Sequence, residues 1–413
     1  MVLKEYDVIV VGAGPSGSST ALFLKKNGVN NVLLIDKAKF PRDKICGDAF
    51  SGKSMGIAKE LGILDNFKNL QTETVYGVIF SSPKGTRIEV PFPGCEDRKS
   101  AKAKPGFVVR RQEGDNIIFQ EAKKKVDTLE DFTVTDLLWN KDFVCGVKGK
   151  TKNGKEAEIK AKVVVGADGA TSTISQKVGL KQNPPEHHVI ATRAYYYGAQ
   201  GNSGNIELHF VDEIMPGYFW IFPMADGWVN VGVGLLTSEK QKRKIDLKKM
   251  QEKIINENPL FKERFKDAQL DSRGIKLWTL PVASYHKKNH GNGWVLVGDA
   301  ASLIDPFSGE GVGNAMTSGK FAGMNIARAL KEGNVSEKNF DAYDKELWNV
   351  IGGEIKTSYN LQKLGNIKWL LNIFIDKAAK KQEVRDVISG MIADEKAKKE
   401  STSPLSLLKM ILT

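Results

Sequence analysis

A cysteine between charged residues and a glycine is the first candidate for chemistry in this chain. Cys46 lies in the loop Pro41-Arg42-Asp43-Lys44-Ile45-Cys46-Gly47-Asp48. A neutral thiol has an ordinary pKa of about 8.5 and can donate a proton to a reacting group. Cysteine is also a common small apolar residue of protein cores. The loop by itself fits both a proton donor and a core residue.

The second candidate is the aromatic run Tyr218-Phe219-Trp220-Ile221-Phe222-Pro223. In a β-strand alternate side chains share one face, so Tyr218, Trp220 and Phe222 would form one flat apolar wall. Such a wall suits a long, flat, apolar substrate better than a polar metabolite. An ordinary core strand packed on a helix has the same periodicity, so the pattern alone leaves both interpretations open.

A glycine-rich segment near the N-terminus predicts that the chain binds a dinucleotide. An apolar strand leads into Gly12-Ala13-Gly14-Pro15-Ser16-Gly17, and a helical stretch follows. Gly12 permits a tight turn, Gly14 lets the backbone approach a pyrophosphate, and Gly17 lets helix and strand pack closely. The start of the helix offers free amide groups to the phosphates. A second strand ends at Asp36, which can accept hydrogen bonds from ribose hydroxyls.

Two later segments favour FAD over NAD. Residues 163–170 form a strand followed by Asp168, and residues 294–301 repeat this arrangement with Asp299. Asp299 is well placed to hold a ribityl hydroxyl. The chain then continues to Gly309-Glu310-Gly311-Val312-Gly313, where the backbone can approach a ring system and a helix begins.

These segments together resemble FAD-dependent oxidoreductases of the para-hydroxybenzoate hydroxylase fold, and among them the geranylgeranyl reductase family. The likeness covers roughly residues 5–350. Arg111 matches the position of an arginine that contacts the flavin in relatives; Arg110, or a plain surface arginine, is the alternative. The resemblance implies that these residues bind the cofactor: Gly12, Ala13, Gly14, Pro15, Ser16, Gly17, Asp36, Lys37, Cys46, Gly47, Asp48, Arg111, Asp168, Gly169, Asp299, Pro306, Gly309, Gly311, Val312 and Gly313.

Three features are similar to the reductases rather than to the hydroxylases of this fold. The loop at Cys46 and Gly47 is similar to one whose cysteine, in geranylgeranyl reductases, faces the flavin and the reacting double bond. Glu310 stands where hydroxylases usually have glutamine, and Ser302 stands where they have histidine. The aromatic run resembles a motif that lines the prenyl-binding cavity, although Met215 replaces a proline of the archaeal form.

The resemblance therefore implies an FAD-dependent reductase that saturates C=C double bonds of a geranylgeranyl or other prenyl chain. Hydride would come from flavin N5, the proton from Cys46 or a water near it, and Tyr218, Trp220 and Phe222 would bind the substrate. An FAD-dependent monooxygenase and a flavin-dependent halogenase are the alternatives. The sequence has no second complete glycine fingerprint, so the external reductant is either NADPH that visits transiently or a ferredoxin-like protein.

The expected fold class is α/β (α+β), with two interleaved domains and a helical tail. Residues 1–70, 105–180 and 280–355 are expected to form a Rossmann-like FAD-binding domain. Residues 71–104 and 181–279 are expected to form an antiparallel-sheet substrate domain, and residues 356–413 a C-terminal helical region. No apolar run approaches the roughly 20 residues of a transmembrane helix.

The charge and the cysteines limit the partners and the compartment. The net charge is +12, but acidic residues are interleaved with the lysines and no nucleic-acid recognition motif accompanies them. An anionic membrane surface or an acidic electron carrier suits this charge better than nucleic acid. An apolar tail at residues 405–412 favours a peripheral membrane contact. Three scattered cysteines predict no metal site and a reducing cytoplasm, so we expect a cytoplasmic protein, with contact on the inner membrane face left open.

Overall fold

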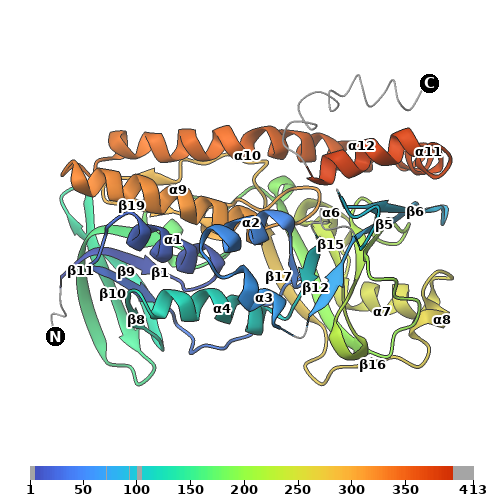
Figure 1. The fold of residues 1–413 in the computed structure, drawn as a ribbon, viewed down its shortest axis with the longest axis horizontal. Helices are drawn as coiled ribbons and strands as arrows, with labels where there is room; N and C mark the ends of the chain where they lie inside the picture. Colours follow the sequence, from blue (N-terminus) through green and yellow to red (C-terminus); the bar gives the residue numbers. More distant parts are fainter. Residues whose placement is uncertain (1–4, 71, 93, 100–104, 394–413) are drawn as a thin grey trace.

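The computed structural model describes residues 5–70, 72–92, 94–99 and 105–393 (Figure 1). Two large sheets dominate this part of the chain, one at each end of the molecule. Long helices run along one side of both sheets, and the last of them cover the second sheet. The mixed α/β class expected from the sequence is confirmed.

The first sheet has the strand order β18-β19-β11-β1-β2-β8, with β10 and β9 added beyond β11. In strand β11, the burial of the side chains depends on which strands lie beside it. Its first half alternates between exposed and buried residues where it pairs with antiparallel β10, and its second half is fully buried between parallel β1 and β19. The strands are β1 (Tyr6–Val11), β2 (Val32–Ile35), β8 (Asp127–Leu129), β9 (Phe132–Asn140), β10 (Phe143–Thr151), β11 (Glu156–Gly166), β18 (His290–Gly291) and β19 (Trp294–Leu296).

Helices α1 and α9 pack against each other closely because glycines line their contact. An added Cβ at Gly319 would lie 2.6 Å from the carbonyl oxygen of Ser16, and one at Gly323 would lie 2.7 Å from Phe23 Cβ. The helix predicted to follow Gly309 is confirmed as α9. The helices around the first sheet are α1 (Pro15–Lys26), α2 (Gly52–Glu60), α3 (Leu64–Lys68), α4 (Arg111–Lys123), α5 (Thr173–Lys177), η3 (Gly298–Ala301), α9 (Val312–Lys331) and α10 (Glu337–Gly365).

The second sheet has the order β16-β12-β15-β14-β13-β5-β6, with β17 also paired to β12. The aromatic run forms β14 (Tyr218–Pro223), as its alternation predicted. The expectation of an antiparallel sheet is wrong at one pair, since β5 and β13 run parallel. Strand β5 comes from an earlier segment of the chain, so no hairpin forces it to run antiparallel to β13. The other strands are β5 (Gly77–Ser81), β6 (Arg87–Pro91), β12 (His188–Tyr197), β13 (Ile206–His209), β15 (Trp228–Leu236), β16 (Gln269–Leu270) and β17 (Lys276–Pro281).

The remaining elements close the space between the two sheets. Helices α11 (Lys368–Lys380) and α12 (Gln382–Ala393) pack on β6 through buried residues such as Leu371 and Ile375. A small third sheet joins β3 (Ala49–Phe50), β7 (Gly106–Val108) and β4 (Glu73–Val75). The other short elements are η1 (Pro185–His187), η2 (Ala225–Gly227), α6 (Thr237–Arg243), α7 (Leu247–Glu257) and α8 (Lys262–Phe265).

Two expectations about organisation are not decided here. The domain bounds stay a prediction, and α10 is continuous across residues 355 and 356. The apolar tail at 405–412 lies outside the described residues. Within the described part of the chain, no helix has the length and apolar character needed to cross a membrane.

Gly319→Ala should lower the free energy of unfolding by about 1–3 kcal/mol, because the added methyl group would push α9 away from α1. Gly56, which lies inside α2 with open space around its Cβ position, provides the matched control. Gly56→Ala should raise the free energy of unfolding by up to about 1 kcal/mol. Urea denaturation of both variants measures this, and equal effects would contradict the close packing.

Candidate active site

One large cavity of about 1640 Å³ extends from the glycine-rich turn to helices α11 and α12. Typical small-molecule pockets have about 300–1,000 Å³, so this space can hold a dinucleotide and part of a second molecule. Its polar part, called the groove here, is lined by Gly12, Gly14, Asp36, Arg42, Lys44, Asp168 and Asp299. Its apolar part, called the chamber, is lined by Val78, Phe80, Ile88, Leu208, Phe210, Leu371 and Phe374.

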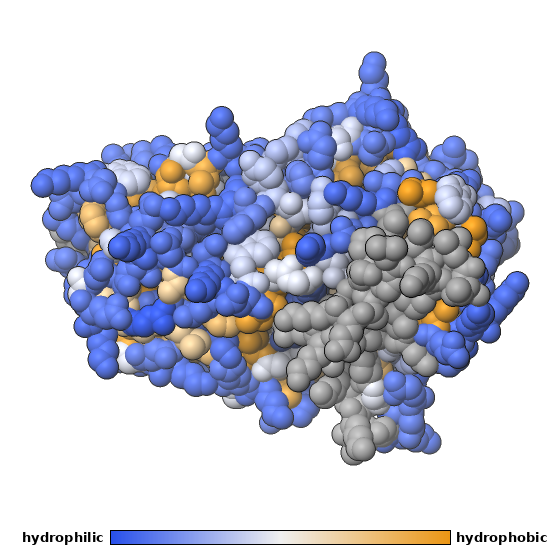
Figure 2. Space-filling view, turned by 90° about the horizontal axis from the view of Figure 1, so that it is seen from above, coloured by the Kyte–Doolittle hydropathy of each residue, from blue (hydrophilic) through white to orange (hydrophobic). Residues whose placement is uncertain are grey.

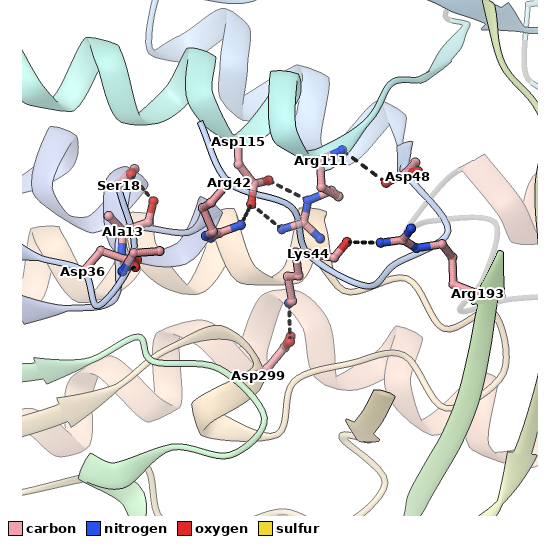
Figure 3. A network of polar contacts seen from close by, with 11 residues as sticks. Ala13, Ser18, Asp36, Arg42, Lys44, Asp48, Arg111, Asp115, Arg193 and Asp299 are labelled. Carbon is pink, nitrogen blue, oxygen red and sulfur yellow. Dashed lines mark hydrogen bonds and ion pairs between the residues drawn. The ribbon is translucent and has the colours of Figure 1, made fainter. Parts of the chain in front are cut away.

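The glycine-rich turn at the groove needs glycine at two positions. Gly12 has φ +101°, and a Cβ there would lie 2.3 Å from the carbonyl oxygen of Ala167. A Cβ at Gly17 would lie 1.8 Å from the carbonyl oxygen of Gly12. The amide of Ala13 donates to Asp36 Oδ2 at 2.8 Å (Figure 3). Asp36 therefore fixes the turn and lines the groove at the same time.

The two later carboxylates have different surroundings. Asp299 lines the groove and pairs with Lys44 at 2.7 Å (Figure 3). Asp168 also lines the groove, but its Oδ2 accepts from the amide of Thr173 at 2.6 Å, where α5 begins. Burial raises the pKa of Asp168 above its ordinary value. Asp299 is the more available of the two for a cofactor hydroxyl.

Most of the predicted cofactor residues line the cavity, and five lie behind its wall. The lining set is Gly12, Gly14, Pro15, Ser16, Asp36, Lys37, Cys46, Gly47, Arg111, Asp168, Gly169, Asp299, Gly309, Gly311 and Val312. The five behind the wall are Ala13, Gly17, Asp48, Pro306 and Gly313. These five support the lining from behind: for example, Gly17 packs on Gly12 and the Pro306 carbonyl accepts from Gln362 at 2.7 Å.

Cys46 lines the cavity as a half-buried free thiol. It lies between Lys44, which pairs with Asp299 of the groove, and Gly47, which packs on Phe222 of the chamber, and this place is called the junction here. Arg111 lies beside it, buried, and donates to both oxygens of Asp115 at 2.5 and 2.9 Å. Arg42 donates to the same carboxylate at 2.9 Å (Figure 3). Burial alone would lower the pKa of Arg111, but Asp115 and Cys46 raise it above its ordinary value. Arg111 therefore places a permanent cation beside the Cys46 thiol.

Arg111 and Arg110, the two alternatives from the sequence, have different surroundings in the structure. Arg111 lines the cavity, whereas the guanidinium of Arg110 stacks over the rings of Tyr195 and Trp228 at 4.7 and 5.3 Å. The plain surface arginine is also excluded for Arg111, which is 2% exposed.

The three aromatic rings of β14 share one face, with ring centroids 6.2 and 6.3 Å apart. Phe222 lines the chamber. Trp220 is buried and fills the space over Gly232, and the hydroxyl of Tyr218 donates to the Ser308 carbonyl at 2.9 Å. Phe222 alone of the three is therefore placed to touch a molecule in the chamber, and its wall comes mainly from other strands and from α11.

Glu310 connects the starts of helices α2 and α9. Its Oε1 accepts from Ser51 Oγ at 2.9 Å and from the Gly313 amide at 2.6 Å. Burial raises the pKa of Glu310 above its ordinary value. Lys53, close by, pairs with Glu354 at 2.6 Å. These charges fix the turn at the start of α9, on the cavity wall.

Several residues of the site were missed by the sequence reasoning. Arg42, Lys44 and Asp115 lay in segments already marked as important, but their ion pairs join residues far apart in sequence. Asn230 had one signal, because it is a single amide in an otherwise apolar strand, and a buried amide needs partners.

The residues of the groove fit FAD. Asp36 and Asp299 can accept from hydroxyl groups, Arg42 and Lys44 supply positive charge near the pyrophosphate-binding turn, and α1 directs its amide groups there. A buried oxygen, Asp305 Oδ2, has no hydrogen-bond partner at the cavity wall and is free to accept one.

Comparisons with known proteins agree with this fit. The chain matches the family model "FAD binding domain" over residues 5–352. It is 33% identical to a digeranylgeranylglycerophospholipid reductase 2 of Methanococcoides burtonii over 370 residues, which is 86% of this chain and 82% of the relative.

Two solved structures share the fold. A geranylgeranyl bacteriochlorophyll reductase-like protein from Thermoplasma acidophilum has a TM-score of 0.81 at 23% identity, covering 100% of this chain and 96% of that one. A flavin-dependent brominase, Bmp2, has a TM-score of 0.78 at 22% identity, covering 98% and 97%. These two structures show the fold, and the match in sequence is to a protein named as a reductase. The chain belongs to the geranylgeranyl reductase family of FAD-dependent oxidoreductases.

Proposed function

We propose that this enzyme saturates C=C double bonds in the geranylgeranyl or other prenyl chain of a lipid. One observation carries the proposal: the apolar chamber opens directly into the groove, and Cys46 lies where the two meet. A chamber lined by Phe80, Phe210 and Leu371 favours an apolar chain over a polar metabolite. The similar protein of Methanococcoides burtonii is named for reduction of a digeranylgeranyl phospholipid, which supports the same substrate class.

In the proposed reaction, the cofactor supplies the hydride and side chains of this protein supply the proton. FAD, once bound and reduced, supplies hydride to one carbon of the double bond. Cys46 would donate the proton to the other carbon and remain as a thiolate until water returns a proton. Arg111 would stabilise that thiolate, because the ion pair with Asp115 keeps the guanidinium protonated and in place. The apolar walls of the chamber would keep water away from the reacting carbons.

A monooxygenase and a halogenase remain the competing functions on the same fold. Both act on activated rings and need oxygen. The chamber is lined by apolar side chains of β5, β6, β13 and α11, which suits an extended apolar chain better than a single activated ring. The donor of electrons is part of the proposal too: either NADPH or an acidic iron–sulfur protein, for which the net charge of +12 is suitable.

The direct test is the reaction itself. The FAD-loaded enzyme, reduced with dithionite without oxygen, should add two hydrogens per saturated bond to a geranylgeranyl lipid, as mass spectrometry would detect. Oxygen-dependent hydroxylation of the lipid, or chlorination in the presence of chloride and oxygen, would instead support one of the competing functions.

Cys46→Ala should keep bound FAD but lower kcat on the order of 10²–10⁴-fold, which is the range for loss of a general acid. Cys145→Ala is the matched control, because Cys145 is also half-buried and lies in β10 of the first sheet. Flavin absorbance gives the FAD content and anaerobic turnover gives kcat. Wild-type turnover by Cys46→Ala would remove the thiol from the mechanism.

Peripheral contact with a lipid surface is the second part of the proposal, and α11 supports it. Ile367, Trp369 and Ile373 are exposed at or on this helix, with Trp369 63% exposed, and Lys377 and Lys380 continue the same face. Figure 2, which looks onto α10 to α12, shows apolar residues in orange at the end where α11 lies. Trp and Lys are residues that favour a membrane interface with anionic lipids.

Replacing Trp369 and Ile373 together by serine should weaken sedimentation with phosphatidylglycerol vesicles roughly tenfold or more, since each buried side chain contributes about 1.5–3 kcal/mol. Trp139→Ser is the control, because Trp139 is 46% exposed on β9 of the other sheet. Equal sedimentation of both variants and wild type would argue against contact through α11.

A further inference from the structure

Asn230 is a buried amide in the middle of an apolar strand. It is 0% exposed in β15, where its neighbours Val229 and Val231 are also fully buried. An amide in such a place destabilises the fold unless its donors and acceptor are hydrogen-bonded. Its partners therefore explain why this strand contains it.

The side-chain hydrogen bonds of Asn230 join it to the loop of Cys46 and Asp48 and to the aromatic strand β14. Its Nδ2 donates to the carbonyl oxygen of Cys46 and to Asp48 Oδ2, both at 2.8 Å. Its Oδ1 accepts from the indole Nε1 of Trp220 at 3.0 Å. An indole N–H can only donate, so Trp220 sets the amide orientation and directs Nδ2 to the loop.

The loop that Asn230 holds is under local strain. Asp48 has φ +66°, a left-handed conformation that residues other than glycine seldom adopt. Its carboxylate also accepts from Tyr195 OH at 2.6 Å and from the Arg111 amide at 3.1 Å. Burial raises the pKa of Asp48 to about 6, against the hydrogen bonds that lower it.

Packing adds a further constraint on the same loop. A Cβ at Gly47 would lie 2.9 Å from the ring of Phe222, so the loop rests directly on the aromatic strand. Phe222 lines the chamber and Cys46 lines the junction. The loop that carries the Cys46 thiol is therefore attached to the second sheet twice, by the packing of Gly47 on Phe222 and by the hydrogen bond from the Asn230 amide.

We propose that Asn230 is a positioning residue that holds the Cys46–Asp48 turn against the aromatic strand and so aims the Cys46 thiol at the molecule in the chamber. Trp220 then acts through Asn230 rather than by touching the substrate. The effect on turnover rests on the proposed function, whereas the effect on the thiol does not.

The test compares Asn230→Ala with Asn183→Ala in the FAD-loaded enzyme. Asn183 is a matched control: it is buried, donates twice through Nδ2 and accepts once through Oδ1, but its partners are His187, Val282 and Ser302. Both variants lose three hydrogen bonds and some stability. Only Asn230→Ala should change Cys46.

The first readout is the rate at which iodoacetamide alkylates Cys46, followed by peptide mass, with Cys145 as the internal reference. Asn230→Ala should raise the Cys46 rate about fivefold or more, the factor that one lost hydrogen bond gives a local opening equilibrium. The Asn183→Ala rate should equal that of wild type. Equal Cys46 rates in the three proteins would overturn the proposal.

The second readout is turnover of a geranylgeranyl lipid. Asn230→Ala should lower kcat on the order of 10²-fold with little change in KM, because a displaced proton donor costs rate rather than binding. A rise in KM with unchanged kcat would overturn the positioning role. If no lipid is reduced by wild type, but alkylation still separates the two variants, the proposed function fails and the role of Asn230 stands.

Two further variants keep the test decisive if Asn230→Ala does not fold. Asn230→Asp keeps the shape and the acceptor for Trp220 but loses both donors, and should raise Cys46 alkylation as the alanine variant does. Trp220→Phe keeps an aromatic ring but loses the N–H that orients the amide, and should raise the rate by about twofold to fivefold. Wild-type alkylation in both would contradict the role of the amide.

Discussion

The buried ion pair between Arg111 and Asp115 is the interaction on which the rest of the site depends. Both side chains are almost fully buried, so the pair offsets a large desolvation cost only because Arg111 makes two hydrogen bonds and Arg42 adds a third. The pair lies within α4 and places a permanent cation beside Cys46; Arg42, which pairs with Asp115, and Asp48, which accepts from the Arg111 amide, join the loop of residues 41–48 to this helix. Lys44 of the same loop pairs with Asp299 (Figure 3). Asp43 pairs with Arg193 of β12 in the second sheet. A short segment thus connects the nucleotide-binding sheet with the second sheet.

The position of the cavity follows from this connection. The first sheet presents the glycine turn and the carboxylates Asp36 and Asp299, and the second sheet presents an apolar face that α11 and α12 cover. Neither sheet would make a site for a redox reaction on an apolar chain without the other. The loop with Cys46 lies at their junction, and the chemistry we propose needs a proton donor at that point.

The fold alone does not choose the reaction, since a brominase shares it. The side chains around the cavity of this chain bear on that choice: Cys46 beside Arg111, Glu310 at the start of α9, and an apolar chamber. The site, and not the arrangement of sheets, carries the argument for a reductase.

The sequence by itself determined the class of fold, the cofactor and the family, because these depend on local patterns. Gly12 and Gly17 belong to one six-residue glycine-rich segment that follows a strand and opens a helix, and the alternation in β14 is a property of any strand. Only the tertiary structure decided how the three rings of β14 are used: Phe222 faces the chamber, while Trp220 turns to Asn230 and Tyr218 to Ser308. It also placed Arg111, and not Arg110, in the cavity wall, and it revealed the contacts of Asn230. These depend on partners far apart in the chain, such as Cys46 and Asn230, whose proximity no local pattern encodes.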